Sequence, residues 1–189
     1  MTIFKEISDS VKGSFNVELP ELNSLSAYLD LIIPHIRNWG EDINETKFFS
    51  SAGGKPWLEI RDGDNFNSII MHFFNDKGEY LRSTNGDILK GKWRLLPDTN
   101  KIIIEAGASE LYDLAYLDNA FFILRKSGAS GGRKYFVMGL EKYCKGLEWR
   151  EFVDLIFNIY LQKHSGTKWI RKIFIAVIII CILVFFVLR

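Results

Sequence analysis

The chain has 189 residues, of which 24 are lysine or arginine and 23 are aspartate or glutamate, so its formal net charge is +1. Five of the basic residues and none of the acidic ones lie in residues 163–189, which leaves 19 basic against 23 acidic side chains in residues 1–162. A nucleic-acid-binding surface needs an excess of cations to displace counterions, so this balance excludes nucleic acid as an expected partner. The length allows one domain of about 100–150 residues and a separate terminal segment.

Residues 1–46 are predicted to form an arm followed by a helix. Apolar residues recur at three- and four-residue spacing from Leu22 to Ile36, which indicates one apolar helix face. Asn23 or Ser24 can cap the helix, and Pro34 can kink or end it. The first residues contain neither a basic segment nor a long apolar run, so no signal peptide is expected.

From residue 47 the apolar period changes to two, which predicts eight or nine short strands. They are expected at 47–51, 57–61, 68–75, 79–83, 88–96, 101–105, 111–117, 120–126 and 135–138. Their connections are short and rich in Gly, Asn, Asp and Pro, as in an antiparallel meander. A meander of this length hides its edges by closing, so the predicted fold is mainly β, with a meander barrel over residues 47–140.

Strand alternation also predicts which faces point outward. In Lys90–Leu95 the three cations share one face, while Gly91, Trp93 and Leu95 share the other, so the cations should lie outside the barrel. The strand at 68–75 is apolar on both faces. Its outer face should therefore be covered, and the N-terminal helix is expected to cover it.

Four short motifs follow one another in the middle of the chain: Gly78-Glu-Tyr80, Gly91-Lys-Trp-Arg-Leu95, Lys101-Ile-Ile-Ile104 and Phe121-Phe-Ile-Leu124. Through them the segment Ser68–Lys126 resembles bacterial lipocalin-like (calycin-type) domains. The resemblance implies a small up-and-down barrel that can have an apolar interior, with Trp93 as its plug. It implies no particular ligand.

No catalytic or metal-binding pattern is found, so the protein is expected to be non-enzymatic, without a metal or cofactor. The three histidines and two cysteines lack metal-ligand spacing. Gly128-Ala-Ser-Gly-Gly132 has the spacing of a Gly-x-Ser-x-Gly motif, but it falls in a loop expected to join two strands, not in the strand-to-helix turn that such a nucleophile needs. His72 is expected to be a core or barrel-lining histidine, with a general base as the alternative. Asp62-Gly-Asp64 is interpreted as a turn rather than a calcium loop, and the glycine-rich loop 127–134 as a hairpin tip rather than a phosphate cradle.

If the barrel is hollow, strand alternation places a set of aromatic and cationic side chains near the cavity. These candidate ligand-binding residues are Trp57, His72, Phe74, Tyr80, Arg82, Trp93, Phe122 and Arg125. Of these, Arg82 and Arg125 are the candidates to meet an anionic group of a ligand.

The C-terminal part is predicted to attach the protein to a lipid bilayer. Residues 141–168 read as an amphipathic helix and a linker, and residues 169–189 as a transmembrane tail anchor. Ile173–Leu188 carries no charge and would span about 24 Å as a helix. The flanking residues that suit the headgroup layers are Trp169, Arg171, Lys172 and Arg189. A buried core helix is the alternative, although the segment has no polar face. The basic flank places the N-terminal domain in the cytoplasm.

These observations predict a membrane-tethered, cytoplasm-facing barrel that binds a small molecule or a protein partner. The alternative is a membrane effector of the anti-phage defence type, whose barrel senses a nucleotide-type second messenger and whose span oligomerises. The span contains no small-xxx-small pair, which argues against close helix dimers. Looser self-association into a homo-oligomer and a monomeric anchor therefore remain equally open.

Overall fold

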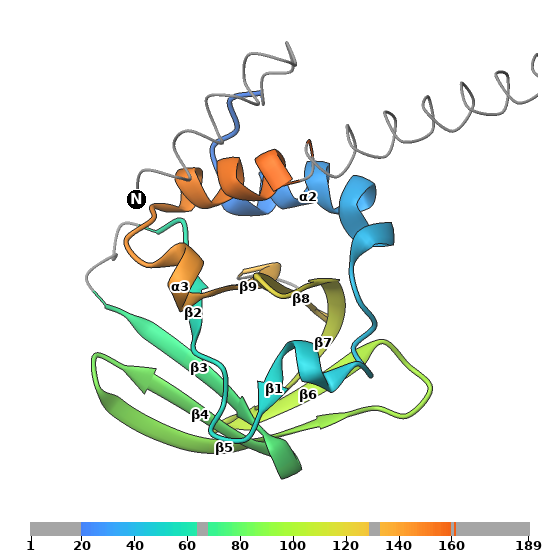
Figure 1. Ribbon diagram of the computed structural model, residues 1–189, viewed down its shortest axis with the longest axis vertical. Helices are drawn as coiled ribbons and strands as arrows, with labels where there is room; N and C mark the ends of the chain where they lie inside the picture. The colour runs from blue at the N-terminus through green and yellow to red at the C-terminus, as the bar shows by residue number, and fades with distance from the viewer. Residues whose placement is uncertain (1–19, 64–67, 129–132, 160, 162–189) are drawn as a thin grey trace, which may run out of the picture. The chain divides into compact units, whose positions relative to one another are not determined.

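Figure 1 shows the computed structural model of the chain, which describes residues 20–63, 68–128, 133–159 and 161. The predicted arm, apart from Pro20, and the predicted tail anchor at 169–189 lie outside these residues. Within the described part of the chain, no helix combines the length and apolar character needed to cross a bilayer.

The elements follow the order that the sequence pattern predicts. The helices and 3₁₀ turns are α2 (Leu25–Ile36), η1 (Arg37–Trp39), η2 (Thr46–Phe48), η3 (Asp76–Gly78) and α3 (Glu141–Cys144), and a further helix begins at residue 149. The strands are β1 (Ser50–Ser51), β2 (Trp57–Ile60), β3 (Ile70–Asn75), β4 (Glu79–Thr84), β5 (Asp87–Leu95), β6 (Lys101–Ala106), β7 (Ala108–Leu117), β8 (Phe121–Lys126) and β9 (Tyr135–Leu140).

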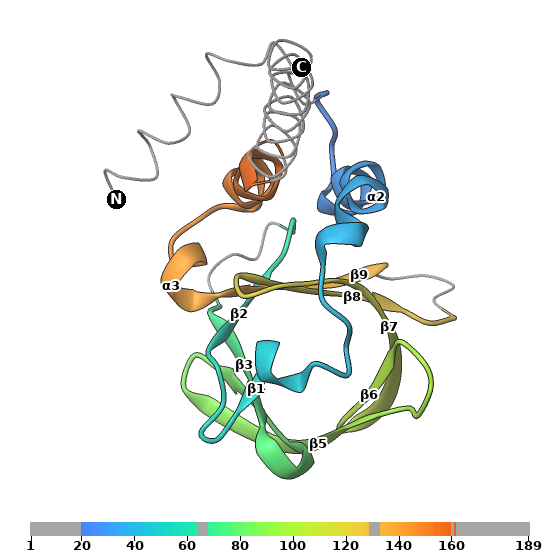
Figure 2. The same cartoon turned by 45° about the vertical axis from the view of Figure 1, so that its right-hand side comes forward.

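Eight of the strands close an all-antiparallel barrel. Each strand from β2 to β9 pairs with its neighbour in sequence, and β9 returns to pair with β2, with Leu140 opposite Trp57. The two-residue β1 adds to β3 in parallel, Ser50 opposite Phe74. Figure 2 shows the ring of strands, with the chain between α2 and β1 crossing its opening. The predicted mainly-β meander barrel is thus confirmed.

The first predicted strand, 47–51, is only partly correct. Its first half is the 3₁₀ turn η2, in which Phe48 N donates to Glu45 O and Phe49 N to Thr46 O, at 3.0 and 3.1 Å. The turn carries the Phe49 side chain into the barrel, where its exposed fraction is 0%. Burial of this ring therefore outweighs the local β pattern that the sequence displays.

Helix α2 begins where a capping residue is available. Ser24 has extended backbone geometry, and its hydroxyl accepts a hydrogen bond from Ala27 N at 3.2 Å, so Ser24 rather than Asn23 is the N-cap. The Asp62 carboxylate accepts from Leu25 N at 2.7 Å, which satisfies another free backbone donor of the first turn. Pro34 lies inside the last turn, and the α-helix ends two residues later.

The expectation that this helix covers β3 is wrong, because α2 packs on the other side of the barrel, against β7. Immediately after α2, Arg37 donates to Ala115 O at 2.7 Å and also to Leu114 O, where the β7–β8 register shifts. The bulge leaves strand carbonyls that this guanidinium can satisfy. On the outside of β3, Gly54 instead lies directly against Phe73.

The predicted faces of β5 are confirmed: Lys90, Lys92 and Arg94 are exposed, while Gly91, Trp93 and Leu95 are less so. Gly91 has a steric reason to be glycine, because a Cβ there would collide with the backbone carbonyl of Glu105 on β6. The close approach of these two backbones explains the glycine of the Gly-x-Trp motif.

Aromatic side chains fill one end of the barrel. The Phe49 ring stacks on that of Phe122 with centroids 4.8 Å apart, and meets the edges of Phe74 and Trp93 at 5.7 and 5.2 Å. Trp57 is fully buried and donates its indole N–H to Phe49 O at 2.9 Å. Trp93, the plug that the resemblance implies, belongs to this cluster but is only partly buried. Phe49, which enters from outside the barrel strands, holds the central position.

Candidate functional site

A polar cavity of about 390 Å³ occupies the opposite end of the barrel. It is lined by Glu59, His72, Tyr80, Arg82, Ile104, Ala106, Ala108, Glu110, Tyr112, Lys126, Arg133, Tyr135 and Phe136. Apart from Arg133, which precedes β9, these residues come from β2, β4, β6 and β8 and from the neighbouring strands β3, β7 and β9, which antiparallel pairing brings together around one end. The resemblance allowed an apolar interior, but two carboxylates and three cations line this end of the barrel. The interior is therefore polar at one end and apolar at the other.

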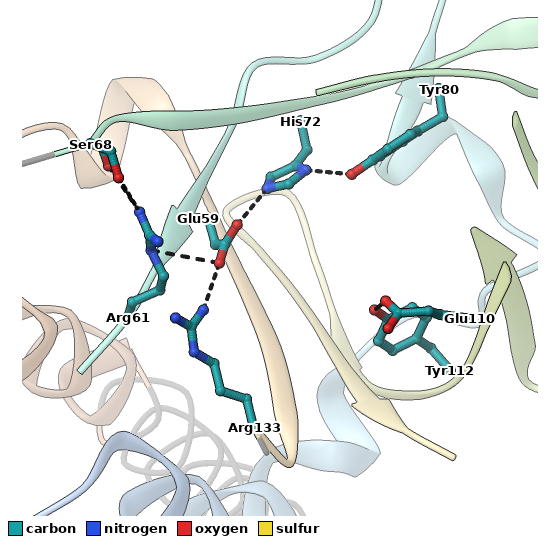
Figure 3. Close-up of polar contacts among 8 residues, drawn as sticks. All are labelled: Glu59, Arg61, Ser68, His72, Tyr80, Glu110, Tyr112 and Arg133. Carbon is teal, nitrogen blue, oxygen red and sulfur yellow. Dashed lines mark hydrogen bonds and ion pairs between the residues drawn. The ribbon is translucent and has the colours of Figure 1, made fainter. Parts of the chain in front are cut away.

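A hydrogen-bonded chain of three side chains crosses the cavity wall (Figure 3). His72 Nδ1 lies 2.6 Å from the Tyr80 hydroxyl, and His72 Nε2 lies 2.9 Å from a carboxylate oxygen of Glu59. An ionised carboxylate can only accept hydrogen bonds, so Nε2 carries the ring proton and donates a hydrogen bond to Glu59. Nδ1 then accepts from the Tyr80 O–H. The order hydroxyl, imidazole, carboxylate fixes one tautomer of His72.

Two arginines hold the Glu59 end of this chain. Arg133 lies 2.8 Å and Arg61 3.7 Å from the same oxygen of Glu59, and Arg61 also donates to the backbone and hydroxyl oxygens of Ser68. Figure 3 shows these groups converging on the Glu59 carboxylate. The carboxylate, whose side chain is 11% exposed, thus has a hydrogen-bond or ion-pair partner on each oxygen.

Burial and charge set the protonation of the chain. Burial opposes ionisation of Glu59, but the hydrogen bond from His72 and the charges of Arg61 and Arg133 outweigh it, so the pKa of Glu59 is lowered. For His72, burial outweighs the attraction of Glu59 and lowers its pKa, which keeps the ring neutral. Burial raises the pKa of Tyr80 well above its usual value. The resting state is therefore a carboxylate, a neutral imidazole and a neutral phenol.

A second polar group lines the cavity from β7. The Tyr112 hydroxyl donates to Glu110, and Lys126 on β8 forms an ion pair with the same carboxylate. The hydrogen bonds from Lys126 and Tyr112 lower the pKa of Glu110, so this residue is ionised as well. Figure 3 shows Glu110 and Tyr112 apart from the Glu59 network.

Arg82 differs from the other cations of the cavity. It lies on β4 two residues after Tyr80, and so on the same strand face, and it pairs across strands with His72. The structure gives its guanidinium neither a hydrogen bond nor an ion pair among the residues described. Arg133 and Lys126, in contrast, each contact a carboxylate.

The structure divides the eight candidate ligand-binding residues into three groups. His72, Tyr80 and Arg82 line the cavity. The four others that point inward, Trp57, Phe74, Trp93 and Phe122, belong to the aromatic cluster at the opposite end. Arg125 is exposed on the face of β8 opposite that of Phe122, so the expectation that it meets a ligand inside the barrel is wrong.

Sequence reasoning missed the carboxylates of the cavity and their partners. Glu59, Glu110, Tyr112 and Arg133 were not among the candidates. The usable signal was the alternation itself: Glu59 is two residues from Trp57, and Glu110 and Tyr112 are two and four residues from Ala108. Inward-pointing carboxylates are costly unless paired, so their partners could have been sought as well.

The other motifs considered in the sequence either have structural roles or lie outside the described residues. Asp62 caps α2, as already described, and within the described ranges no group of three potential metal ligands is found. Cys144 is buried, and burial raises its pKa to about 12, so its thiol is not reactive at neutral pH. Residues 129–132 of the glycine-rich loop lie outside the described residues.

Comparison with known proteins adds no assignment: no family model, curated protein or solved structure matches this chain.

Proposed function

We propose that the protein is a non-enzymatic binding module that holds a small molecule in the cavity of its barrel. The observation that carries this proposal is the cavity itself, about 390 Å³ in volume and lined by convergent polar groups, at the end that the aromatic cluster leaves open. Ligand sites are generally concave, of a few hundred cubic ångströms, with a small number of placed polar groups. An eight-stranded barrel is just wide enough for one small ligand.

The finer interpretation is a lipocalin-like barrel. Eight strands in up-and-down order, closed between first and last, support it, since lipocalins share that architecture. A binding role is favoured over catalysis because the hydroxyl of Tyr80 has a raised pKa and its partner His72 a lowered one. Both shifts oppose transfer of the phenol proton to the imidazole, which activation of this hydroxyl would require.

Filling the cavity should abolish binding. Ala108 lines the mouth of the cavity and is exposed, so Ala108→Trp should block it without disturbing the core. We would screen a library of soluble fragments by ligand-observed NMR against the full-length protein. At least one fragment should bind the wild type and show no binding to Ala108→Trp.

Ser109→Trp is the matched control for this test. Ser109 is the next residue of β7, is also exposed, and is not part of the cavity lining, so its replacement should leave the fragments bound. A screen without hits, or hits that survive Ala108→Trp unchanged, would contradict the proposed function.

Attachment to a membrane is part of the same proposal. It is supported by the sequence of residues 169–189, whose uncharged run and basic flank fit a single-pass anchor with a cytoplasmic N-terminal domain. The barrel would then work at a bilayer surface, with the lipid bilayer as one partner.

A second candidate is the regulated effector, in which the cavity senses a nucleotide-type messenger. The observation that favours it is a cation beside aromatic faces: Arg82 lines the same cavity as His72 and Phe136, whose rings meet edge to face at 4.8 Å. Full-length protein co-expressed with a nucleotide cyclase should then arrest growth, whereas a passive binder should not. Loss of the arrest in Ala108→Trp but not in Ser109→Trp would assign it to the cavity.

A further inference from the structure

Among the residues that the structure describes, one cation of the cavity contacts no carboxylate. Glu59 contacts His72, Arg133 and Arg61, and Glu110 contacts Lys126 and Tyr112. Both carboxylates are thus already occupied by other groups. Since His72 is neutral, the five charged residues of the lining are three cations and two anions. The unbalanced positive charge belongs to Arg82.

This arrangement is costly without a ligand. The Arg82 side chain is only partly exposed, and a cation taken out of water needs a partner to offset its lost hydration. The Coulomb field of Arg82 lowers the pKa of Glu110, but that carboxylate already contacts Lys126 and Tyr112. An anion beside the guanidinium would offset the lost hydration of Arg82 directly.

We infer that Arg82 binds the carboxylate of a small organic acid whose carbon body lies against the apolar side of the cavity. This rests on the proposed function, because it names the class of ligand for the same cavity. Ile104, Ala106 and Phe136 supply the apolar surface. The rings of Tyr112 and Phe136 lie 5.6 Å apart and His72 meets Phe136 edge to face, so an aromatic acid fits these walls best.

A carboxylate suits this cavity better than a phosphate dianion. The planar fork of a guanidinium matches two carboxylate oxygens with two parallel hydrogen bonds. A dianion would need a second cation, and Lys126 and Arg133 could supply it only by leaving Glu110 and Glu59. Loss of Lys126 would leave the Glu110 carboxylate without its ion-pair partner, and loss of Arg133 would leave Glu59 with only the more distant Arg61, at 3.7 Å.

Calorimetry with three probes of similar shape tests this inference on the full-length protein. Benzoate carries a carboxylate, benzamide is its uncharged counterpart, and phenylphosphonate carries a larger anion. Benzoate should bind the wild type at least about tenfold more tightly than benzamide, because only benzoate neutralises the guanidinium. Phenylphosphonate should be weaker than benzoate.

Variants identify the residue responsible. Arg82→Gln should bind benzoate about tenfold more weakly or worse, and Arg82→Lys, which keeps the charge but loses the fork, should fall between. Arg94→Gln is the control, since Arg94 is exposed on the outer face of β5 and forms its ion pair there with the partly exposed Glu105, at 3.6 Å. It should bind benzoate as the wild type does.

The outcomes separate this inference from the proposed function. Equal affinity for benzoate and benzamide, no benzoate binding at all, or unchanged binding by both Arg82 variants would overturn the assignment of Arg82. Tighter binding of phenylphosphonate would overturn the carboxylate and favour the nucleotide-type alternative. In each case fragments blocked by Ala108→Trp would still support a binding cavity. Because the benzoate–benzamide comparison uses the wild type, it remains decisive even if Arg82→Gln fails to fold.

Discussion

Replacing Trp57 by alanine is expected to destabilise the barrel by about 3–5 kcal/mol, as other large aromatic-to-alanine changes in cores do. The side chain is fully buried, its ring meets that of Phe122 at 5.8 Å, and its indole N–H donates to Phe49 O. The substitution removes the ring and leaves a buried carbonyl without its donor. Urea unfolding of the full-length protein, followed by far-UV circular dichroism, measures the change.

Trp93→Ala is the informative comparison for this result. Trp93 touches the same cluster and donates its N–H to Asn75 O at 2.8 Å, but it is partly exposed. Its replacement should therefore cost clearly less unfolding free energy than that of Trp57, measured by the same urea unfolding. If Trp93→Ala were equally or more destabilising, Trp93 would be the plug that the Gly-x-Trp resemblance implies.

Removal of the Glu59 carboxylate should have the second-largest effect. Glu59→Ala takes away the group that His72, Arg133 and Arg61 share. Deleting one partner of a buried ion pair typically costs about 3–5 kcal/mol. We expect about 3 kcal/mol, at the lower end of that range, because Arg133 is half exposed and can turn to water. Equilibrium unfolding at neutral pH tests it.

The pH dependence of this effect has a definite sign. The pKa of Glu59 in the folded state is lowered, so its charge stabilises the fold above the ordinary glutamate value of 4.5. That contribution is lost as the pH falls through the lowered folded pKa. The difference in unfolding free energy between wild type and Glu59→Ala should therefore be full at neutral pH and shrink under acid conditions.

Glu105→Ala serves as the matched control for Glu59. Glu105 also pairs with an arginine, Arg94, but both side chains are substantially exposed, 43% and 60%. Exposed pairs contribute less than about 1 kcal/mol because water screens them. An equal loss from Glu59→Ala and Glu105→Ala would mean that the Glu59 network adds nothing beyond a surface ion pair.

Alternation of side chains was sufficient to predict the barrel but not to locate its cavity. The period of two identifies which residues point inward, and Trp57, His72, Phe74 and Tyr80 do so as expected. It does not say how far along the barrel axis each one lies. Trp57 and Glu59 are two residues apart on β2, yet one packs in the aromatic cluster and the other lines the cavity.

The missing information is the pairing register, which depends on contacts far apart in sequence. The position of Phe49 illustrates this, because a 3₁₀ turn outside the barrel strands delivers its ring to the core. Once Phe49 fills one end, the aromatic residues around it belong to the core rather than to a ligand site. No local pattern near residue 49 reveals this, since it follows from the volume that the closed barrel must fill.

The pairing of the first barrel strand with the last also bears on how the chain is made. In the folded protein β2 pairs with β3 along one edge and with β9 along the other. Residues 137–140 of β9, which pair with β2, are synthesised about 80 residues after it. Until then the nascent meander has two open edges that can recruit other chains. A ribosome that stops before residue 140 would release an edge-exposed sheet, so such truncated products should aggregate or be degraded rather than persist as partial barrels.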